Sequence, residues 1–563
     1  MLPRERRIEK LIEAKTIDGL LMREMAVAGS ALLEANRAEV DALNVFPVPD
    51  GDTGTNMSLT MQSAVREISA KEFLRADEAC AALSKGALRG ARGNSGVITS
   101  QLLRGFAKSL NGVEKITPEL FARAMKAGSD LAYKAVMKPK EGTILTVARV
   151  MAEDALQQVQ QTPDSFDALF TTILRSGADI LRKTPEMLPA LKQAGVVDSG
   201  GRGLLYIYTG YAAVLRGESI EELIQQSTGA DDGSFRDDHD AIIDLNFEYH
   251  VAFSLRSLSE DYSQSDVDSM RRRLNRIGNM VNIDGEAAPY RVHVHTNDPG
   301  DALQFGVELG EVTDIEIVNM AAERRAKQPA PAEEAPAEPE APAERKKSGM
   351  VAVSLGDGFS HIFRDLGVDV VVEGGQTMNP SIDDIHQAII HCNAETVYVF
   401  PNNGNVVMAA NQAAEIADCK VFVIPTKNVA MGIAAAVAFQ PDAEGEKNAE
   451  AMKEAAENVK TATVTFAVRD SENNGVTIHE GDFIGLQNGQ IACAGGDLDE
   501  VITRTMDAVM TEDDELITVY YGSDVSEEDA KKMADQIADS YPDCDVECLA
   551  GGQPLYYYLI SVE

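Results

Sequence analysis

The sequence predicts three domains of different fold class: an all-α helical bundle or barrel, a small α+β domain and an α/β domain. The chain has 563 residues, enough for several domains that each bury a core. Apolar residues recur at helical spacing through roughly the first 215 residues, and strand-like runs follow only later. Two polar, pattern-free stretches separate these parts, so we expect domains at 1–220, 243–320 and 349–563, with linkers at 221–242 and 321–348.

The first domain is predicted to be helical throughout. Apolar side chains lie three or four residues apart in each segment, and glycine-bearing turns separate the segments. The predicted helical segments are 17–43, 61–68, 79–88, 98–110, 121–136, 144–159, 166–181 and 204–215.

The most informative stretch of the first domain is 44–57, Asn-Val-Phe-Pro-Val-Pro-Asp-Gly-Asp-Thr-Gly-Thr-Asn-Met. Asp50 and Asp52 flank a glycine where two prolines prevent a helix. Mg²⁺ is usually held by one or two carboxylates together with substrate phosphates, so this pair suits a nucleotide–metal site. An isolated Asp-Gly-Asp more often forms a plain turn before a capped helix, but the longer string favours the metal site. Donors for phosphate follow where a helix begins, at Thr53, Gly54, Thr55, Asn56 and Met57.

Three further turns have the same architecture. Each places small or hydroxyl residues at a predicted helix start, where backbone N–H groups and the helix dipole favour phosphate. The candidate residues are Gly93, Asn94, Ser95, Gly96, Thr143 and Asp198.

These strings, with 90–98 and 141–147, resemble the ATP-binding subunit of bacterial fatty acid kinase, and the first domain is similar to the nucleotide-binding subunit of dihydroxyacetone kinase. The resemblance implies that four loops meet at one end of the bundle and bind ATP and Mg²⁺. Dihydroxyacetone kinase has a third metal-binding Asp before the pair. The nearest candidate here is Asn44, whose amide oxygen is able to ligate a hard cation.

The middle domain is predicted from strands at 247–255 and 290–296 and a helix at 265–278. His293 and His295 are two residues apart on a strand, so they share a face. They are either metal ligands or proton carriers, or an exposed face that happens to hold two imidazoles.

The segment 292–300 again resembles the fatty acid kinase subunit, whose middle domain has these histidines at the phosphotransfer site and a cysteine on the earlier strand. His250 stands where that cysteine aligns. The residues leave open a Zn²⁺ site of three histidines or a metal-free acid/base cluster.

The third domain alternates strand and helix after an Ala/Pro/Glu-rich tether. Apolar, β-branched runs at 351–354, 368–372, 396–400 and 421–424 predict a parallel sheet. The loops 374–381, 401–405 and 425–428 follow these strands, and they resemble the carboxy-terminal domain of the same family, which is similar to DegV-type fatty-acid-binding proteins. A ligand-binding role and a structural or partner-docking role are both open for these loops.

Composition excludes several classes of function. The net charge of −39, from 90 acidic and 51 basic residues, disfavours nucleic acid and electrostatic membrane docking. The apolar runs are too short for an integral membrane segment. Six cysteines without a Cys-x-x-Cys pair, and the lack of a secretory pattern, indicate a cytoplasmic location.

The resemblance implies an ATP-dependent kinase that phosphorylates the carboxylate of a fatty acid held by a separate DegV-type carrier protein. It also favours a homodimer. Two alternatives remain: a small-molecule kinase of the dihydroxyacetone type, and a non-catalytic regulator that binds nucleotide and a lipid carrier.

Overall fold

The computed structural model describes residues 15–45, 51–220, 223–224, 249–258, 267, 270, 273–274, 278–284, 290–296, 299–319, 345–375, 379–467, 471–473, 476–554 and 556–563. For some of these, His250 and His295 among them, it describes only the backbone. The chain divides into two compact units, one formed by 1–230 with 344–563 and the other by 231–343. Both predicted linkers lie largely outside the described residues.

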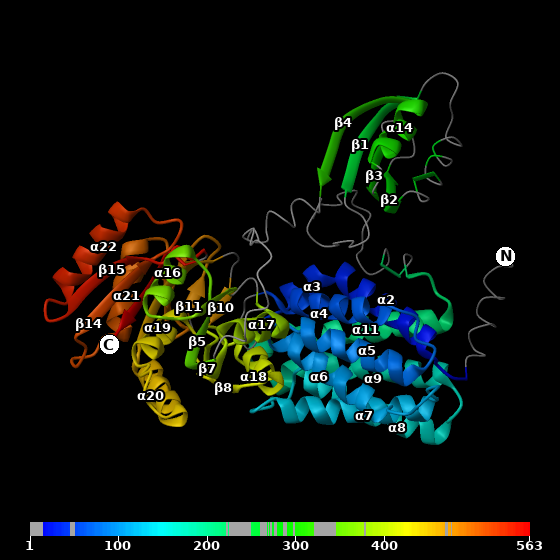
Figure 1. The fold of residues 1–563 in the computed structure, drawn as a ribbon, viewed down its shortest axis with the longest axis horizontal. Coiled ribbons are helices and arrows are strands. Elements are labelled where there is room, and N and C mark those ends of the chain that lie inside the picture. Colours follow the sequence, from blue (N-terminus) through cyan, green and yellow to red (C-terminus); the bar gives the residue numbers. More distant parts are fainter. Residues whose placement is uncertain are drawn as a thin grey trace, which may run out of the picture. The chain divides into compact units, whose positions relative to one another are not determined.

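Helices form the whole first part of the chain, as the apolar spacing predicts (Figure 1). Neighbouring long helices pack in sequence order and α11 returns beside α2, so the bundle closes into a ring. The helices are Gly19–Ala35 (α2), Arg37–Ala42 (α3), Thr53–Ser69 (α4), Ala76–Gly90 (α5), Gly93–Ser109 (α6), Pro118–Ala135 (α7), Ile144–Gln161 (α8), Phe166–Met187 (α9), Pro189–Ala194 (α10) and Ser199–Arg216 (α11).

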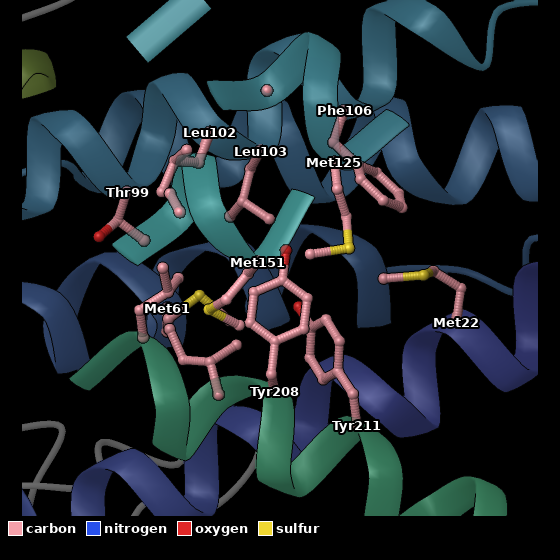
Figure 2. Close-up of a pocket in the computed structure, with 14 residues that line it drawn as sticks. Met22, Met61, Thr99, Leu102, Leu103, Phe106, Met125, Met151, Tyr208 and Tyr211 are labelled. Atoms are coloured by element: carbon pink, nitrogen blue, oxygen red, sulfur yellow. The ribbon is translucent and has the colours of Figure 1, made fainter. Parts of the chain in front are cut away.

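Small residues close the ring where α2 meets α11. A Cβ placed on Gly210 would lie 2.5 Å from the Cα of Gly29, so only glycine permits this approach. Inside the ring is an apolar cavity of about 30 Å³, lined by sulfur and aromatic side chains that include Met61, Met151 and Tyr208 (Figure 2). Met and aromatic side chains thus fill the centre of the bundle, and polar chemistry is left to its end.

The C-terminal part begins with a parallel sheet of order β6-β5-β7-β8, as predicted. Its strands β5, β7 and β8 are buried between helices, which explains their continuous apolar runs. The elements are Lys346–Ser354 (β5), Asp357–Asp365 (α16), Val370–Glu373 (β6), Ile382–Cys392 (α17), Ala394–Phe400 (β7), Val407–Ile416 (α18), Lys420–Val423 (β8), Val429–Val437 (α19) and Gly445–Asn458 (α20). Strand β5 starts three residues before the domain start predicted from composition.

A second sheet follows, of order β13-β12-β9-β16-β14-β15, in which only β14 and β15 run parallel. Helices α21 and α22 pack on it through Val501, Ile502, Ala530 and Met533. The elements are Lys460–Phe466 (β9), Ser471–Asn473 (β10), Val476–Ile478 (β11), Phe483–Gln487 (β12), Gln490–Gly495 (β13), Leu498–Val509 (α21), Leu516–Tyr521 (β14), Glu527–Ser540 (α22), Asp545–Ala550 (β15) and Tyr558–Val562 (β16).

The second unit is an antiparallel sheet of order β2-β3-β1-β4 with a helix against it. Its elements are Tyr249–Leu258 (β1), Gly278–Asp284 (β2), Tyr290–Thr296 (β3), Pro299–Leu309 (α14) and Gly310–Asn319 (β4). Strand β2 was not predicted, because asparagines interrupt its apolar alternation. Most of the predicted helix at 265–278 lies outside the described residues. The predicted combination of all-α, α+β and α/β parts is confirmed.

Candidate functional site

Four helix N-termini line one cavity at an end of the bundle. The cavity has a volume of about 270 Å³ and receives residues from the starts of α4, α6, α8 and α11. Each helix start carries a partial positive charge and free backbone N–H groups, so four of them around one space form an anion site. The sequence placed these four starts in separate turns, and the fold brings them together.

The start of α4 is held in place by side chains that precede it. The amide oxygen of Asn44 accepts a hydrogen bond from the Thr53 backbone N at 3.0 Å and another from the Thr53 hydroxyl. The carboxylate of Asp41 accepts from the backbone N and hydroxyl of Thr55, at 3.0 and 2.9 Å. Burial raises the pKa of Asp41, and the Thr55 hydrogen bonds oppose that rise. Asp41 escaped the sequence analysis because its role depends on contact with a turn fourteen residues away.

Asp52 lies at the cavity wall and is only 8% exposed. It occupies the N-cap position of α4, yet its side chain makes no capping hydrogen bond. Its Oδ2 instead accepts from the Nδ2 of Asn379, in the C-terminal domain. The predicted partner carboxylate, Asp50, lies outside the described residues, together with 46–49.

Hydroxyl groups connect the helix starts to one another. The hydroxyl of Ser95 donates to the backbone oxygen of Thr53 at 3.4 Å, and the hydroxyls of Ser199 and Thr53 are 3.3 Å apart. Gly93 starts α6 with φ +54°, a backbone conformation that favours glycine. A Cβ there would lie 2.4 Å from the Nδ2 of Asn56.

Asp198 caps α11 from within the cavity wall. Its Oδ2 accepts from the backbone N of Gly201 at 2.7 Å. Burial raises the pKa of Asp198 to about 7, although backbone hydrogen bonds from Gly201 and Ile144 favour the charged form. A carboxyl group with such a pKa changes charge near neutral pH and can either accept from or donate to a ligand.

The predicted nucleotide residues fall into two sets. One set lines the cavity directly: Asn44, Asp52, Thr53, Asn94, Ser95, Thr143 and Asp198. The other set lies next to the lining residues in the chain and shapes the helix starts: Gly54, Thr55, Asn56, Met57, Gly93 and Gly96. Within this second set, Met57 is fully buried in the bundle core, and a Cβ on Gly54 would meet the Arg37 backbone oxygen at 2.4 Å.

The cavity also has lining residues that the sequence analysis missed. Lys138 and Lys140 are exposed and supply its cationic side chains. Their proximity to Gly142-Thr143 was the available signal. Asn405 and Met408 come from the C-terminal domain, and nothing in the local sequence points to them.

The residues that fit Mg²⁺ are the Asp52 carboxylate and the neighbouring amide of Asn379. The Oδ1 of Asn379 is buried and has no hydrogen-bond partner. Carboxylate and amide oxygens are suitable ligands for a hard cation, so these side chains fit the predicted metal.

The predicted histidine positions are neighbours in the sheet of the middle domain. His250 pairs with His295 across β1 and β3, and His293 pairs with Ala252 two residues along. The side chains of His250 and His295 lie outside the described residues, so the predicted Zn²⁺ site stays a prediction. Among the side chains that are described, no group of three His, Cys, Asp or Glu residues is placed to hold a metal ion.

Comparison with known proteins matches all three parts of the chain to family models. The matches are the FakA-like fatty acid kinase C-terminal domain at 349–563, the FakA-like fatty acid kinase middle domain at 246–327 and the DAK2 domain at 47–213. Protein YloV of Bacillus subtilis (strain 168) is 41% identical over 98% of this chain and 100% of its own length. The chain belongs to the FakA-like fatty acid kinase family. The predicted resemblance is thereby confirmed.

Other relatives of this FakA-like chain have no assigned activity in their names. An uncharacterized protein of Staphylococcus aureus (strain USA300) is 38% identical over 97% of the chain and 99% of its own length. The solved structure of DegV, a fatty acid binding protein from Bacillus subtilis, matches 38% of the chain and 99% of its own length with 12% identity and a TM-score of 0.30. That likeness is too low to support an argument about function.

Two further findings concern the environment of this FakA-like chain. All six cysteines are free thiols. Among the residues that the structure describes, no helix has the length and apolar character needed to cross a membrane.

Proposed function

We propose that this chain is the ATP-dependent kinase component that phosphorylates the carboxylate of a fatty acid held by a separate DegV-type carrier protein. The observation that supports it is the cavity in which four helix N-termini surround Asp52, in a chain whose three parts match the FakA-like and DAK2 family models. The products are an acyl phosphate, for phospholipid synthesis, and ADP.

The chain's own residues would act on the phosphates of ATP. The backbone N–H groups at the starts of α4 and α6 and the hydroxyls of Thr53 and Ser95 would bind and orient them. Asp52, with Asp50 and Asn44 as the predicted companions, would hold the Mg²⁺. When bound, Mg²⁺ neutralises charge on the phosphates as the transferring group develops its transition state.

The acceptor needs orientation more than activation. A fatty acid is already ionised at neutral pH, so one carboxylate oxygen attacks the γ-phosphorus, the bond to the bridging oxygen breaks, and ADP leaves with that electron pair. No proton is transferred in this balance. We propose that His293, with His295 and His250, positions the carboxylate or stabilises charge there, with or without Zn²⁺.

The test is ATP consumption with oleate, measured with and without a DegV-type fatty-acid-binding protein. Turnover that requires carrier and lipid together supports the proposal. Turnover with dihydroxyacetone instead would support the small-molecule kinase, which the DAK2 match favours. Nucleotide binding without turnover under any pairing would support the non-catalytic regulator.

Asp52→Asn should abolish turnover while the chain stays folded, because the amide replaces a charged ligand by a neutral one of the same shape. The readouts are ATP turnover and the melting temperature. Near-normal turnover in this variant would remove the metal assignment.

His293→Ala should lose acyl-phosphate formation and keep ATP affinity, since the histidines are assigned to the acceptor. Chemical trapping of the acyl phosphate and calorimetry with an ATP analogue measure the two properties separately. Unchanged acyl-phosphate formation would contradict the role of His293. A cytoplasmic homodimer remains part of this proposal, and size-exclusion chromatography with light scattering tests the dimer.

A further inference from the structure

The C-terminal domain packs directly on the helix starts that form the cavity. Arg92, at the N-cap of α6, makes a β-bridge with Ser381, and the backbone N of Ile382 donates to the Ala91 oxygen at 3.1 Å. A guanidinium N–H of Arg92 donates to the backbone oxygen of Asn379 at 2.8 Å. Ala91 and Val97 share one buried cluster with residues of α17 and α18, so the contact has an apolar core. The segment beside Asn379 is therefore fixed to the bundle by backbone contacts.

Two C-terminal side chains form part of the cavity wall itself. The Oδ1 of Asn405 accepts from the Nδ2 of Asn94 at 2.7 Å, and Asn405 and Met408 both line the cavity. A ligand at the four helix starts would therefore also meet the C-terminal domain.

The side chain of Asn379 is the most unusual of these contacts. It is 2% exposed, and its Nδ2 donates to the carboxylate of Asp52. Its Oδ1 is buried without any hydrogen-bond partner. A buried amide oxygen normally has a partner, because leaving it unpaired forfeits the hydrogen bonds it makes with water. The unpaired oxygen is thus an acceptor held ready next to a carboxylate.

A cation at Asp52 changes which end of the amide is favourable. Without a cation, the NH₂ group must face the carboxylate, since an amide oxygen there would be repelled. With Mg²⁺ on that carboxylate, the NH₂ hydrogens would face positive charge. Rotation about the last side-chain bond exchanges the two ends and presents Oδ1, which is a suitable ligand for a hard cation.

We propose that Asn379 is a magnesium ligand supplied by the C-terminal domain, so that this domain completes the nucleotide–metal site of its own chain. The inference rests on the proposed function, because it takes a magnesium nucleotide as the occupant at Asp52. It adds a ligand 327 residues away from Asp52 in sequence and makes metal binding and docking of the C-terminal domain interdependent.

The experiment compares the affinity for a non-hydrolysable ATP analogue in Mg²⁺ with the affinity in EDTA, by calorimetry on the full chain. The ratio of the two affinities is the gain from the metal. In Asn379→Ala this gain should fall about tenfold, as expected when a metal site loses a supporting group, and binding in EDTA should change little. Asn379→Asp keeps an oxygen and should retain a gain at least as large as that of the wild type.

The matched control is Gln412→Ala. It removes the hydrogen bond between the Gln101 and Gln412 side chains, 2.6 Å long, from the same domain contact, and neither residue lines the cavity. Its gain should equal that of the wild type. A gain reduced as far as in Asn379→Ala would show that loosening of the contact, and not a lost ligand, explains the result.

Three other results would overturn the inference. A larger gain in Asn379→Ala would show that the amide only competes with the metal for Asp52. An equal loss of affinity with Mg²⁺ and with EDTA would show a packing role. If Asn379→Ala fails to fold, a gain in Asn379→Asp below that of the wild type contradicts the ligand role. No binding of the analogue by the wild type in either condition would instead refute the proposed function.

Discussion

Replacement of Asp198 by asparagine should remove a pH dependence from the stability of the helical domain. Asp198 is buried at the start of α11, and burial raises the pKa of its carboxyl group from 3.8 to about 7. Asparagine keeps an oxygen that can accept from the Gly201 N–H and is an equally good N-cap, but it does not titrate in this range.

The sign follows from the two pKa values. Between about pH 4 and pH 7 the folded chain holds a proton on Asp198 that the unfolded chain has lost, so the wild type loses stability as pH rises. The contribution is fully present below about pH 4 and is lost as pH passes through about 7. A shift of about three units corresponds to roughly 4 kcal/mol as a ceiling, at 1.36 kcal/mol per unit.

The assay is urea unfolding of nucleotide-free wild type and Asp198→Asn between pH 4.5 and 8, followed by a probe in the helical domain. The difference in unfolding free energy, variant minus wild type, should rise by a few kcal/mol over this range. The change with pH is the readout, because the hydrogen bond from Ile144 adds a constant effect of the amide at every pH. Parallel pH profiles for the two proteins would refute the raised pKa.

Two further predictions concern the cavity. Gly93→Ala should weaken ATP-analogue binding about tenfold and destabilise the chain by about 1–2 kcal/mol, because φ is +54° and the new methyl would lie 2.4 Å from the Nδ2 of Asn56. The control Gly112→Ala, at φ +82° with no atom within 4 Å, should lose similar stability and keep its affinity, and equal affinities in both variants would contradict the role of the α6 start. Lys138→Ala and Lys140→Ala should each lower analogue affinity several-fold and reduce its salt dependence, since both cations line the cavity, whereas Lys134→Ala at the end of α7 should not; an unchanged salt dependence would exclude contact with phosphate.

Local patterns in the sequence determined the kinds of secondary structure and the places where helices begin. Apolar spacing predicts most of the bundle because a surface helix must bury one face. It missed α10, a six-residue helix too short to show a period, and the end of α9, where Pro185 lies inside the helix. The small and hydroxyl residues after Asp52, Arg92, Gly142 and Asp198 marked four helix starts, because those positions need close approach and capping.

Tertiary structure decided which groups share one site. The four helix starts meet because the ring of helices closes, and closure depends on packing between segments far apart in the chain. Asp41, which holds Thr55, and Lys138 and Lys140 at the cavity wall look like ordinary surface charges in the sequence. The pairing of His250 with His295 likewise required the register of β1 and β3.

The family of this chain, the fold class of its parts and the chemistry of Asp50 and Asp52 are therefore legible in the sequence, because each depends on short motifs. The contribution of Asn379 and Asn405 is not legible there. Asparagine in a loop is common, and only the packing of α17 and α18 on the bundle brings these amides to Asp52 and Asn94. Contacts across hundreds of residues are set by burial of apolar surface between domains, which no local pattern specifies.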